Sequence, residues 1–291
     1  MEEISKSGSE PSKGIFYVVA TPIGNLDDIT YRAVRILNQV DIIAAEDTRH
    51  TLKLLNHFNI EKKSISCNEQ NEEKRAEEFI LKLNQGLNIA LVSDAGTPSV
   101  SDPGFKIVRR IIKEKIDVIP IPGCSAAIAG LSVAGLPTDS FLFKGFLPKK
   151  MGKRNAIISE LASEKSTLIF YESPRRIITL IEEIIEILGN RSAMLAREIT
   201  KLHEEYIRGT LENIVEKLKT KELVKGECTL YVQGSDNEVK IDDNELDNEI
   251  RQELSKTDQS NLGTSSETAP CLCTGSMPLA RVQVPSLPLR S

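Results

Sequence analysis

The 291-residue sequence contains no tryptophan, and aromatic residues make up only 4% of it. Aliphatic side chains must therefore fill the core, and a chain of this length can bury a sizeable one in one or two domains. Its apolar runs fall far short of the ~18 residues that a membrane-spanning helix needs. The polar start MEEISKSGSEPSKG is unlike a secretory signal. These absences predict a cytoplasmic protein that does not enter a membrane.

Cysteine and histidine are too few and too scattered to predict a metal site. The five cysteines include no CxxC pair, and the three histidines form no HExxH sequence. Cys271 and Cys273 are separated by one residue, which alone does not make a metal site. We therefore expect no metal and a reducing environment, in agreement with a cytoplasmic location.

Acidic and basic residues are unevenly distributed along the chain. There are 42 acidic and 37 basic residues, which gives a net charge of −5. Residues 236–291 contain ten of the acids and five of the bases, so residues 1–235 hold 32 of each and are neutral. The overall charge therefore argues against a strongly basic nucleic-acid-binding protein, and any contact with RNA must use a local patch.

The common phosphate-binding loops are also missing. The loop after the first predicted strand has one glycine, where a dinucleotide-binding fold would have GxGxxG, and no Walker A sequence occurs. This argues against a ligand whose pyrophosphate lies on a glycine-rich turn.

The first 135 residues alternate short apolar runs with amphipathic segments, a pattern typical of a parallel sheet covered by helices. Asp27 or Asp28 is expected to cap a helix after the first strand, and residues 71–84 predict another helix. Right-handed crossovers would bring the loops after four of the strands to one edge of the sheet, where α/β proteins hold ligands. The predicted strands are residues 15–20, 41–45, 64–67, 89–92 and 117–121.

The stretch NIALVSDAGTPSVSDPGF, residues 88–105, has the clearest strand–loop–helix pattern. Gly96 gives its loop backbone freedom and lets another molecule approach closely. Asp102 and Pro103 then predict the cap and the first residue of a helix. The alternative to a ligand site is a sharp turn followed by a capping aspartate.

The charged run EDTRH, residues 46–50, directly follows the second predicted strand. One interpretation is a helix cap by Asp47 or Thr48 together with a surface ion pair between Glu46 and Arg49. The other is a functional site, because five polar groups exceed what one cap needs.

A helix rich in small residues follows the fifth strand, over residues 125–135. Small side chains allow close approach either of a ligand or of a packed sheet, and both interpretations stay open.

The second half of the chain mixes strands and helices and is expected to form its own, partly antiparallel sheet. Its basic segment contains Lys144, Lys149, Lys150, Lys153 and Arg154, with no acid among them. That segment is either a solvated loop or a patch that contacts phosphates. The predicted strands are residues 141–146, 166–171, 192–196 and 228–232, and the predicted helices are residues 177–188 and 211–218.

The expected organisation has four parts. Residues 1–13 are a disordered lead, 14–136 an N-terminal α/β domain and 137–234 a C-terminal α/β domain. Residues 235–291 comprise an acidic helix over 236–256 and a disordered tail of serine, threonine, proline and glycine without periodicity.

Seven motifs in this chain together resemble the tetrapyrrole-methylase-like, class III methyltransferases over roughly residues 15–234. Two of them, TPIGNL and AAEDTRHT, resemble the branch of that family that methylates a cytidine 2′-hydroxyl in bacterial 16S ribosomal RNA. The family's compact C-terminal extension is not recognisable beyond residue 256, which a frame change or a fused foreign sequence would explain. The motifs are TPIGNLDDIT (21–30), AAEDTRHT (44–51), SDAGTP (93–98), GLPTDSF with GFLP (135–148), FYESPRR (170–176), ARE (196–198) and KGE (225–227).

The resemblance implies two α/β domains with a cleft between them, in which S-adenosylmethionine binds folded as the methyl donor of a homodimer. It implies 16S rRNA within the small ribosomal subunit as the substrate. Expected RNA contacts are Arg49, Lys149, Lys150, Lys153 and Arg154. The expected donor-binding residues are Pro22, Gly24, Asn25, Asp94, Gly96, Thr97, Pro98, Val100, Ser125, Ala126, Tyr171, Ala196 and Gly226.

A ribose hydroxyl is a weak nucleophile, so a carboxylate that accepts its proton would help the reaction. Among the acids of these loops, Glu46, Asp94 and Glu172 are the candidate catalytic residues. Arg49 and Arg197 are candidates for orienting a carboxylate or binding phosphate.

Two alternative functions stay open: a methylase of a small tetrapyrrole-like molecule on the same fold, and a non-catalytic nucleotide-binding module. The basic segment and AAEDTRHT favour RNA over a tetrapyrrole. Polar groups after four separate strands argue against binding alone, since a binding module seldom needs so many reactive groups.

Overall fold

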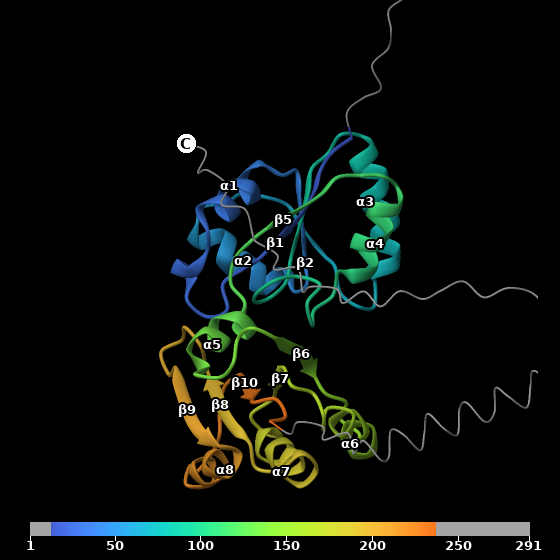
Figure 1. Ribbon diagram of the computed structural model, residues 1–291. Coiled ribbons are helices and arrows are strands. Elements are labelled where there is room, and N and C mark those ends of the chain that lie inside the picture. Colours follow the sequence, from blue (N-terminus) through green and yellow to red (C-terminus); the bar gives the residue numbers. More distant parts are fainter. Residues whose placement is uncertain (1–12, 237–291) are drawn as a thin grey trace, which may run out of the picture. The chain divides into compact units, whose positions relative to one another are not determined.

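The computed structural model describes residues 13–236, which form two five-stranded sheets with their helices (Figure 1). The predicted acidic helix and tail lie outside the described residues apart from Ser235 and Asp236, as does all but the last residue of the predicted lead. None of the helices in the described part of the chain is long and apolar enough to cross a membrane.

The first sheet is entirely parallel, with the strand order β3-β2-β4-β1-β5. The five predicted strands are confirmed: β1 (Phe16–Val19), β2 (Ile42–Ala45), β3 (Ser64–Ser66), β4 (Ile89–Val92) and β5 (Val118–Ile121). Its helices are the 3-10 helix η1 (Leu26–Asp28) and the α-helices α1 (Tyr31–Gln39), α2 (Thr48–His57), α3 (Glu72–Asn84) and α4 (Phe105–Lys113).

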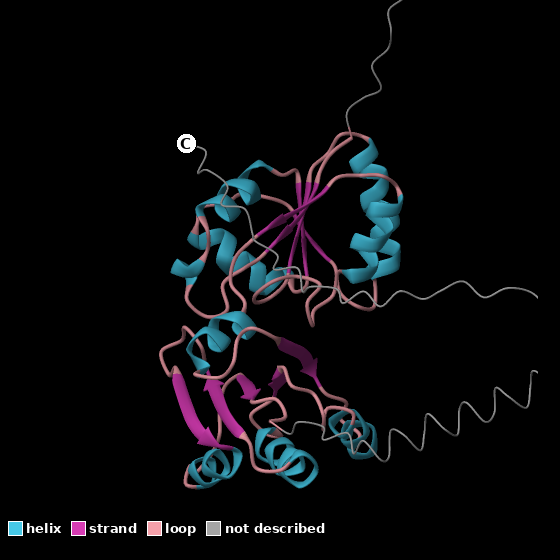
Figure 2. Cartoon of the chain, in the orientation of Figure 1, coloured by secondary structure: helices cyan, strands magenta, loops and turns pink. Residues whose placement is uncertain are grey.

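The inner strands of this sheet are largely apolar because helices cover both of its faces (Figure 2), whereas the edge strand β3 is Ser-Ile-Ser. Helices α1 and α2 lie on one face, and α3 and α4 on the other. On the α1–α2 face the core includes Val19, Leu37, Ile43, Leu55 and Val92. On the α3–α4 face it includes Phe16, Ala44, Phe79, Leu83 and Ile111.

Two of the predicted helix starts are wrong. Thr30, not Asp27 or Asp28, caps α1, because its Oγ1 accepts a hydrogen bond from the N–H of Ala33 at 3.1 Å. The two aspartates instead lie in η1. Helix α4 begins at Phe105, after Gly104 with φ of 131°, so Asp102 and Pro103 belong to the preceding loop.

The start of α2 agrees with one of the predicted alternatives. Asp47 caps it by accepting a hydrogen bond from the N–H of Arg49 at 2.9 Å. The predicted ion pair between Glu46 and Arg49 is wrong, because the Arg49 guanidinium pairs with Asp47 at 2.7 Å.

The second sheet is mixed, with the order β6-β7-β10-β8-β9. Only β6 and β7 run parallel, and the other neighbours are antiparallel, as the sequence predicts. The strands are β6 (Phe141–Phe146), β7 (Thr167–Glu172), β8 (Ser192–Arg197), β9 (Glu205–Thr210) and β10 (Cys228–Val232). The helices are α5 (Ala126–Ala134), α6 (Met151–Ser159), α7 (Ile177–Leu188) and α8 (Leu211–Lys219).

Helices α6, α7 and α8 pack on one face of the second sheet, and α5 packs on the other. Strand β9 and helix α6 were not predicted, and α6 occupies the second part of the basic segment. Helix α5 precedes residue 136 in the sequence, yet it packs on β8 and β10 of the second sheet. The division of domains at 136/137 stays a prediction.

Small residues in α5 allow it to lie close against the second sheet. A Cβ atom at Gly130 would lie 2.0 Å from the hydroxyl oxygen of Tyr231. That hydroxyl donates a hydrogen bond to the carbonyl of Ala126 at 2.7 Å, and the Tyr171 hydroxyl accepts one from the N–H of Ala127 at 3.2 Å. Tight packing therefore explains Gly130, whereas the first turn of the helix is held in place by tyrosines.

We predict that Gly130→Ala lowers the free energy of unfolding by about 1–3 kcal/mol, because the added methyl group overpacks the contact with Tyr231. Urea denaturation measures this change. Gly152→Ala in α6 is the matched control, because nothing lies within 4 Å of a Cβ there. That control should leave stability unchanged or raise it by about 0.5–1 kcal/mol. An equal response of the two variants would contradict the packing explanation.

Candidate functional site

The loops after β1 and β4 diverge at the carboxyl edge of the first sheet. The chain leaves β1 for α1 on one face and leaves β4 for α4 on the other. The two loops are joined where they part: the N–H of Thr21 donates to the carbonyl of Gly96 at 2.8 Å, and the N–H of Gly96 donates to that of Thr21 at 3.1 Å. Such a switch point opens a crevice in which α/β proteins bind ligands.

The loop after β5 is tied to this pair. The Thr97 hydroxyl donates to the carbonyl of Cys124 at 3.2 Å, and the Cys124 thiol donates to the carbonyl of Asp28 at 3.3 Å. Three loops from separate strands therefore form one connected wall.

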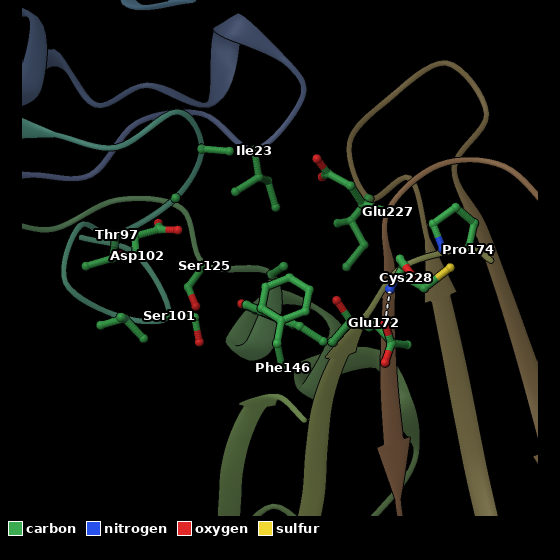
Figure 3. A pocket seen from close by; sticks show the side chains of 18 residues that line it. Ile23, Thr97, Ser101, Asp102, Ser125, Phe146, Glu172, Pro174, Glu227 and Cys228 are labelled. Carbon is green, nitrogen blue, oxygen red and sulfur yellow. Dashed lines mark hydrogen bonds between the residues drawn. The ribbon is translucent and has the colours of Figure 1, made fainter. Parts of the chain in front are cut away.

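A cavity of about 350 Å³ lies between this wall and the second sheet (Figure 3). Its volume is within the range of small-molecule sites. The lining residues are Ile23, Ala95, Gly96, Thr97, Val100, Ser101, Asp102, Ser125, Ala126, Phe146, Tyr171, Glu172, Ser173, Pro174, Ile199, Glu227, Cys228 and Thr229.

The cavity brings together part of the predicted donor site. Six predicted residues line it: Gly96, Thr97, Val100, Ser125, Ala126 and Tyr171. Seven others do not: Pro22, Gly24, Asn25, Asp94, Pro98, Ala196 and Gly226.

Packing accounts for two of the glycines outside the lining. A Cβ atom at Gly24 would lie 2.4 Å from Cγ of Lys201, and the neighbouring N–H of Asn25 donates to the Thr200 hydroxyl at 3.1 Å. At Gly226, with φ of 87°, a Cβ atom would lie 2.3 Å from the side chain of Glu198. These glycines allow loops of the two sheets, or loops within the second sheet, to touch.

Two of the three candidate catalytic acids, Glu46 and Asp94, form hydrogen bonds that connect their loops to each other. Glu46 Oε2 accepts a hydrogen bond from the N–H of Asp94 at 3.3 Å, and Asp94 Oδ1 accepts one from the N–H of Asp47 at 3.1 Å. Burial raises the pKa of Glu46 above its usual value, partly opposed by the hydrogen bond from Asp94. Neither Glu46 nor Asp94 lines the cavity.

The third candidate, Glu172, lines the cavity, but its carboxylate is engaged inside the protein. Its Oε1 pairs with the Arg176 guanidinium at 2.6 Å and accepts a hydrogen bond from the N–H of Ser173. The other carboxylate oxygen is buried without a partner, and the side chain is 1% exposed. A proton acceptor must reach its substrate, and this carboxylate does not.

Two acids that line the cavity, Asp102 and Glu227, were not identified as site residues by the sequence patterns. Asp102 lines the cavity on the side of the first sheet, with Glu227 on the opposite side (Figure 3). Burial, followed by the nearby carboxylate of Glu46, raises the pKa of Asp102 to about 6. The sequence predicted Asp102 as a helix cap, because Asp-Pro before an apolar run is typical of a helix start. The same pattern also fits a loop residue that lines a cavity, so the sequence did not distinguish the two.

The backbone around Asp102 is strained. Two flanking serines adopt left-handed conformations, Ser99 with φ of 69° and Ser101 with φ of 64°. Such conformations are rare outside glycine, and they concentrate at functional sites.

The candidate RNA-binding residues have different environments. Lys149, Lys150 and Lys153 are exposed at the start of α6. Arg154, by contrast, is 7% exposed and forms a two-point ion pair with Glu183, so its guanidinium serves the fold and is not available to RNA.

The two remaining arginines differ in the same way. Arg49 is largely exposed and pairs with the neighbouring Asp47, so it remains accessible. Arg197 pairs with Glu205 at 2.8 Å and donates to the carbonyl of Lys225, which explains it as part of the second sheet.

Sequence comparison places most of the chain in one family. Residues 16–215 match the family described as tetrapyrrole (corrin/porphyrin) methylases. The chain is 51% identical over 227 residues to "Ribosomal RNA small subunit methyltransferase I" of Halalkalibacterium halodurans, covering 78% of each protein. It is 42% identical to the protein of that name from Thermotoga maritima, covering 77% of this chain and all of the relative.

Solved structures of low sequence identity share the fold. A diphthine synthase matches with a TM-score of 0.59 at 15% identity, over 76% of this chain and 89% of that structure. The uroporphyrin-III C-methyl transferase of Thermus thermophilus, complexed with S-adenyl homocysteine, matches with a TM-score of 0.51 at 16% identity, over 75% and 96%. These matches confirm the predicted two-part α/β fold.

We predict that Asp102→Asn stabilises the protein at neutral pH. The folded pKa of about 6 exceeds the usual 3.8, so the folded state binds more protons between these values, and stability falls as pH rises through them. Because Asp102 is only half-buried, the gain at pH 7.5 is about 1–2 kcal/mol and disappears near pH 4.

Urea denaturation of both proteins between pH 4 and pH 7.5 measures this difference. Asp139→Asn, at an exposed position, controls for the loss of a negative charge. An Asp102→Asn variant no more stable than the wild type at pH 7.5 would show that burial of Asp102 carries no penalty.

Proposed function

The chain belongs to the tetrapyrrole methylase family, and from this we propose that it methylates ribosomal RNA with S-adenosylmethionine as the methyl donor. The observation that carries the proposal is the 51% identity, over most of both chains, to a relative named as a ribosomal RNA small subunit methyltransferase. Other relatives with that name match at 40–48% identity over 76–84% of this chain.

The cavity suits this donor in size and in chemistry. Gly96 and Thr97 would hold it through the connected wall of loops, and Ile23 and Ile199 offer apolar surface. The carboxylate of Glu227 faces the cavity and would accept hydrogen bonds from the donor's hydroxyl or ammonium groups. Its negative charge also complements a cationic sulfonium.

The donor supplies a methyl group on a positively charged sulfur, which a nucleophile displaces in line. What this chain contributes is position, because holding the two reactants in alignment supplies a large part of the acceleration. The first turn of α5, fixed by Tyr171 and Tyr231, and the loop of Gly96 are rigid parts of that holder.

The finer points of the proposal rest on the motifs. TPIGNL and AAEDTRHT support a cytidine 2′-hydroxyl in 16S rRNA, within the small ribosomal subunit, as the acceptor. We also propose a homodimer in the cytoplasm, and the division into domains over 14–136 and 137–234. Glu46 and the seven predicted donor residues outside the cavity lining, Asp94 among them, would act on the site indirectly, by fixing its loops.

Transfer of tritiated methyl groups from the donor to purified small ribosomal subunits that lack the modification tests this function. Labelled cytidine in 16S rRNA is the expected result. Free 16S rRNA and free tetrapyrroles are the comparison substrates, and labelling of a tetrapyrrole alone would favour the small-molecule alternative.

We predict that Gly96→Val weakens donor binding about tenfold or more, measured by calorimetry without RNA, because the side chain enters the cavity wall. Gly96 has φ of 83°, so the change also strains the backbone. Gly135→Val is the matched control: that glycine has φ of 72°, and nothing lies within 4 Å of its Cβ position. Equal donor affinities in the two variants would mean that the donor binds elsewhere.

We predict that replacing Lys149, Lys150 and Lys153 together with alanine weakens binding to small subunits and flattens its salt dependence. Each lost phosphate contact lowers the slope of log K against log salt by roughly 0.7–0.9. Alanine at Lys113, Lys115 and Lys217, which are exposed on other elements, removes the same charge as a control. If both triple variants keep the wild-type slope, the basic segment is only a solvated surface.

A further inference from the structure

The acids around the cavity differ in what already occupies their carboxylates. Glu172 is paired with Arg176, and Glu227 is paired with Lys201 at 3.1 Å. Asp102 forms no ion pair with a basic residue of the described chain, and the hydroxyl of Ser93 is the one neighbouring polar group there that lowers its pKa. Of the carboxylates that line the cavity, Asp102 is therefore the one that is not neutralised by an ion pair within the described chain.

The loop of Asp102 is fixed from behind by a buried acid of another helix. Oε1 of Glu72, in α3, accepts hydrogen bonds from the N–H groups of Gly104 at 2.9 Å and Lys106 at 3.0 Å. In front, a Cβ atom at Gly145 of β6 would lie 2.5 Å from Oγ of Ser101, so the two sheets meet beside Asp102. Strained left-handed serines persist only where the surroundings hold them, and these contacts do so.

Negative charge surrounds Asp102 on several elements. The carboxylates of Glu46 after β2, Asp94 after β4 and Glu227 before β10 all raise its pKa. Burial, together with these groups, raises its pKa to about 6, so at neutral pH the carboxylate is largely ionised and still basic enough to take a proton.

We propose that Asp102 is the catalytic base of this enzyme: its carboxylate accepts the proton of the RNA hydroxyl as that oxygen attacks the methyl group. This proposal rests on the proposed function. The bond between oxygen and methyl carbon forms while the bond between sulfur and methyl carbon breaks, and its electron pair stays on sulfur. The hydroxyl proton passes to Asp102, so a cation and an anion become neutral products.

The test compares Asp102→Asn with the wild type in single-turnover methyl transfer to small subunits between pH 5 and pH 8.5. The expected loss is about 100-fold or more at neutral pH, because a general base contributes at least that much. Donor affinity by calorimetry should stay unchanged, because Asn keeps the shape and hydrogen-bonding capacity of the side chain. The wild-type rate should rise with pH up to about 6, and this rise should be missing in the variant.

A second variant separates catalysis from a structural role. Asp102→Ala should lose activity and regain part of it when formate supplies a free carboxylate. Asp139→Asn, at an exposed site away from the cavity, should keep wild-type activity. Thermal melting curves establish that each variant is folded.

Three results would overturn the proposal. The first is an Asp102→Asn rate within about threefold of the wild type at every pH, since loss of a base costs far more. The second is a loss of donor affinity as large as the loss of rate, which would make Asp102 a donor ligand. The third is an unchanged pH profile together with no formate rescue. A wild-type protein that methylates no RNA would overturn the proposed function as well.

Discussion

Two hydrogen bonds between the second sheet and the first turn of α5 determine the geometry of the cavity. The Tyr231 hydroxyl donates to the carbonyl of Ala126, and the Tyr171 hydroxyl accepts from the N–H of Ala127. Because Ser125 and Ala126 line the cavity, these bonds fix part of its wall to the opposite sheet. Tyrosine hydroxyls held away from water need partners, and here the first turn of a helix supplies them: the carbonyl of Ala126 and the N–H of Ala127, which has no acceptor within the helix.

The contact between the sheets also changes the interpretation of the sequence motifs. TPIGN, ARE and KGE contain glycines and charged residues that suggest a ligand site. In the structure, Gly24 makes room for Lys201 and Gly226 for Glu198. A motif in this chain therefore marks a place where two segments must approach closely, and only some of these places face the cavity.

Local patterns were sufficient to predict most of the fold. The apolar runs gave the strands of both sheets except β9, because a buried strand is recognisable from its own residues. Partners distant in sequence were not predictable in this way. Arg154 belongs to a basic run, yet it is buried in an ion pair with Glu183, which lies 29 residues away in the sequence. Likewise Asp102 has the local signature of a cap, but Glu72 satisfies the N–H groups at the start of α4 from another helix.

The role of Glu72 in place of the predicted cap explains why the carboxylate of Asp102 can face the cavity. In a capping aspartate, a carboxylate oxygen accepts a hydrogen bond from a backbone N–H group in the first turn of its own helix. Glu72 accepts hydrogen bonds from the N–H groups of Gly104 and Lys106 at the start of α4. Asp102 therefore does not have to cap this helix, and its side chain lies toward the cavity. Its burial among other acids lowers the free energy of unfolding at neutral pH. The surrounding contacts hold the loop in place despite this loss. The same burial raises its pKa into the range in which a carboxylate exchanges protons at neutral pH, so the loss of stability and the proposed chemistry have one physical cause.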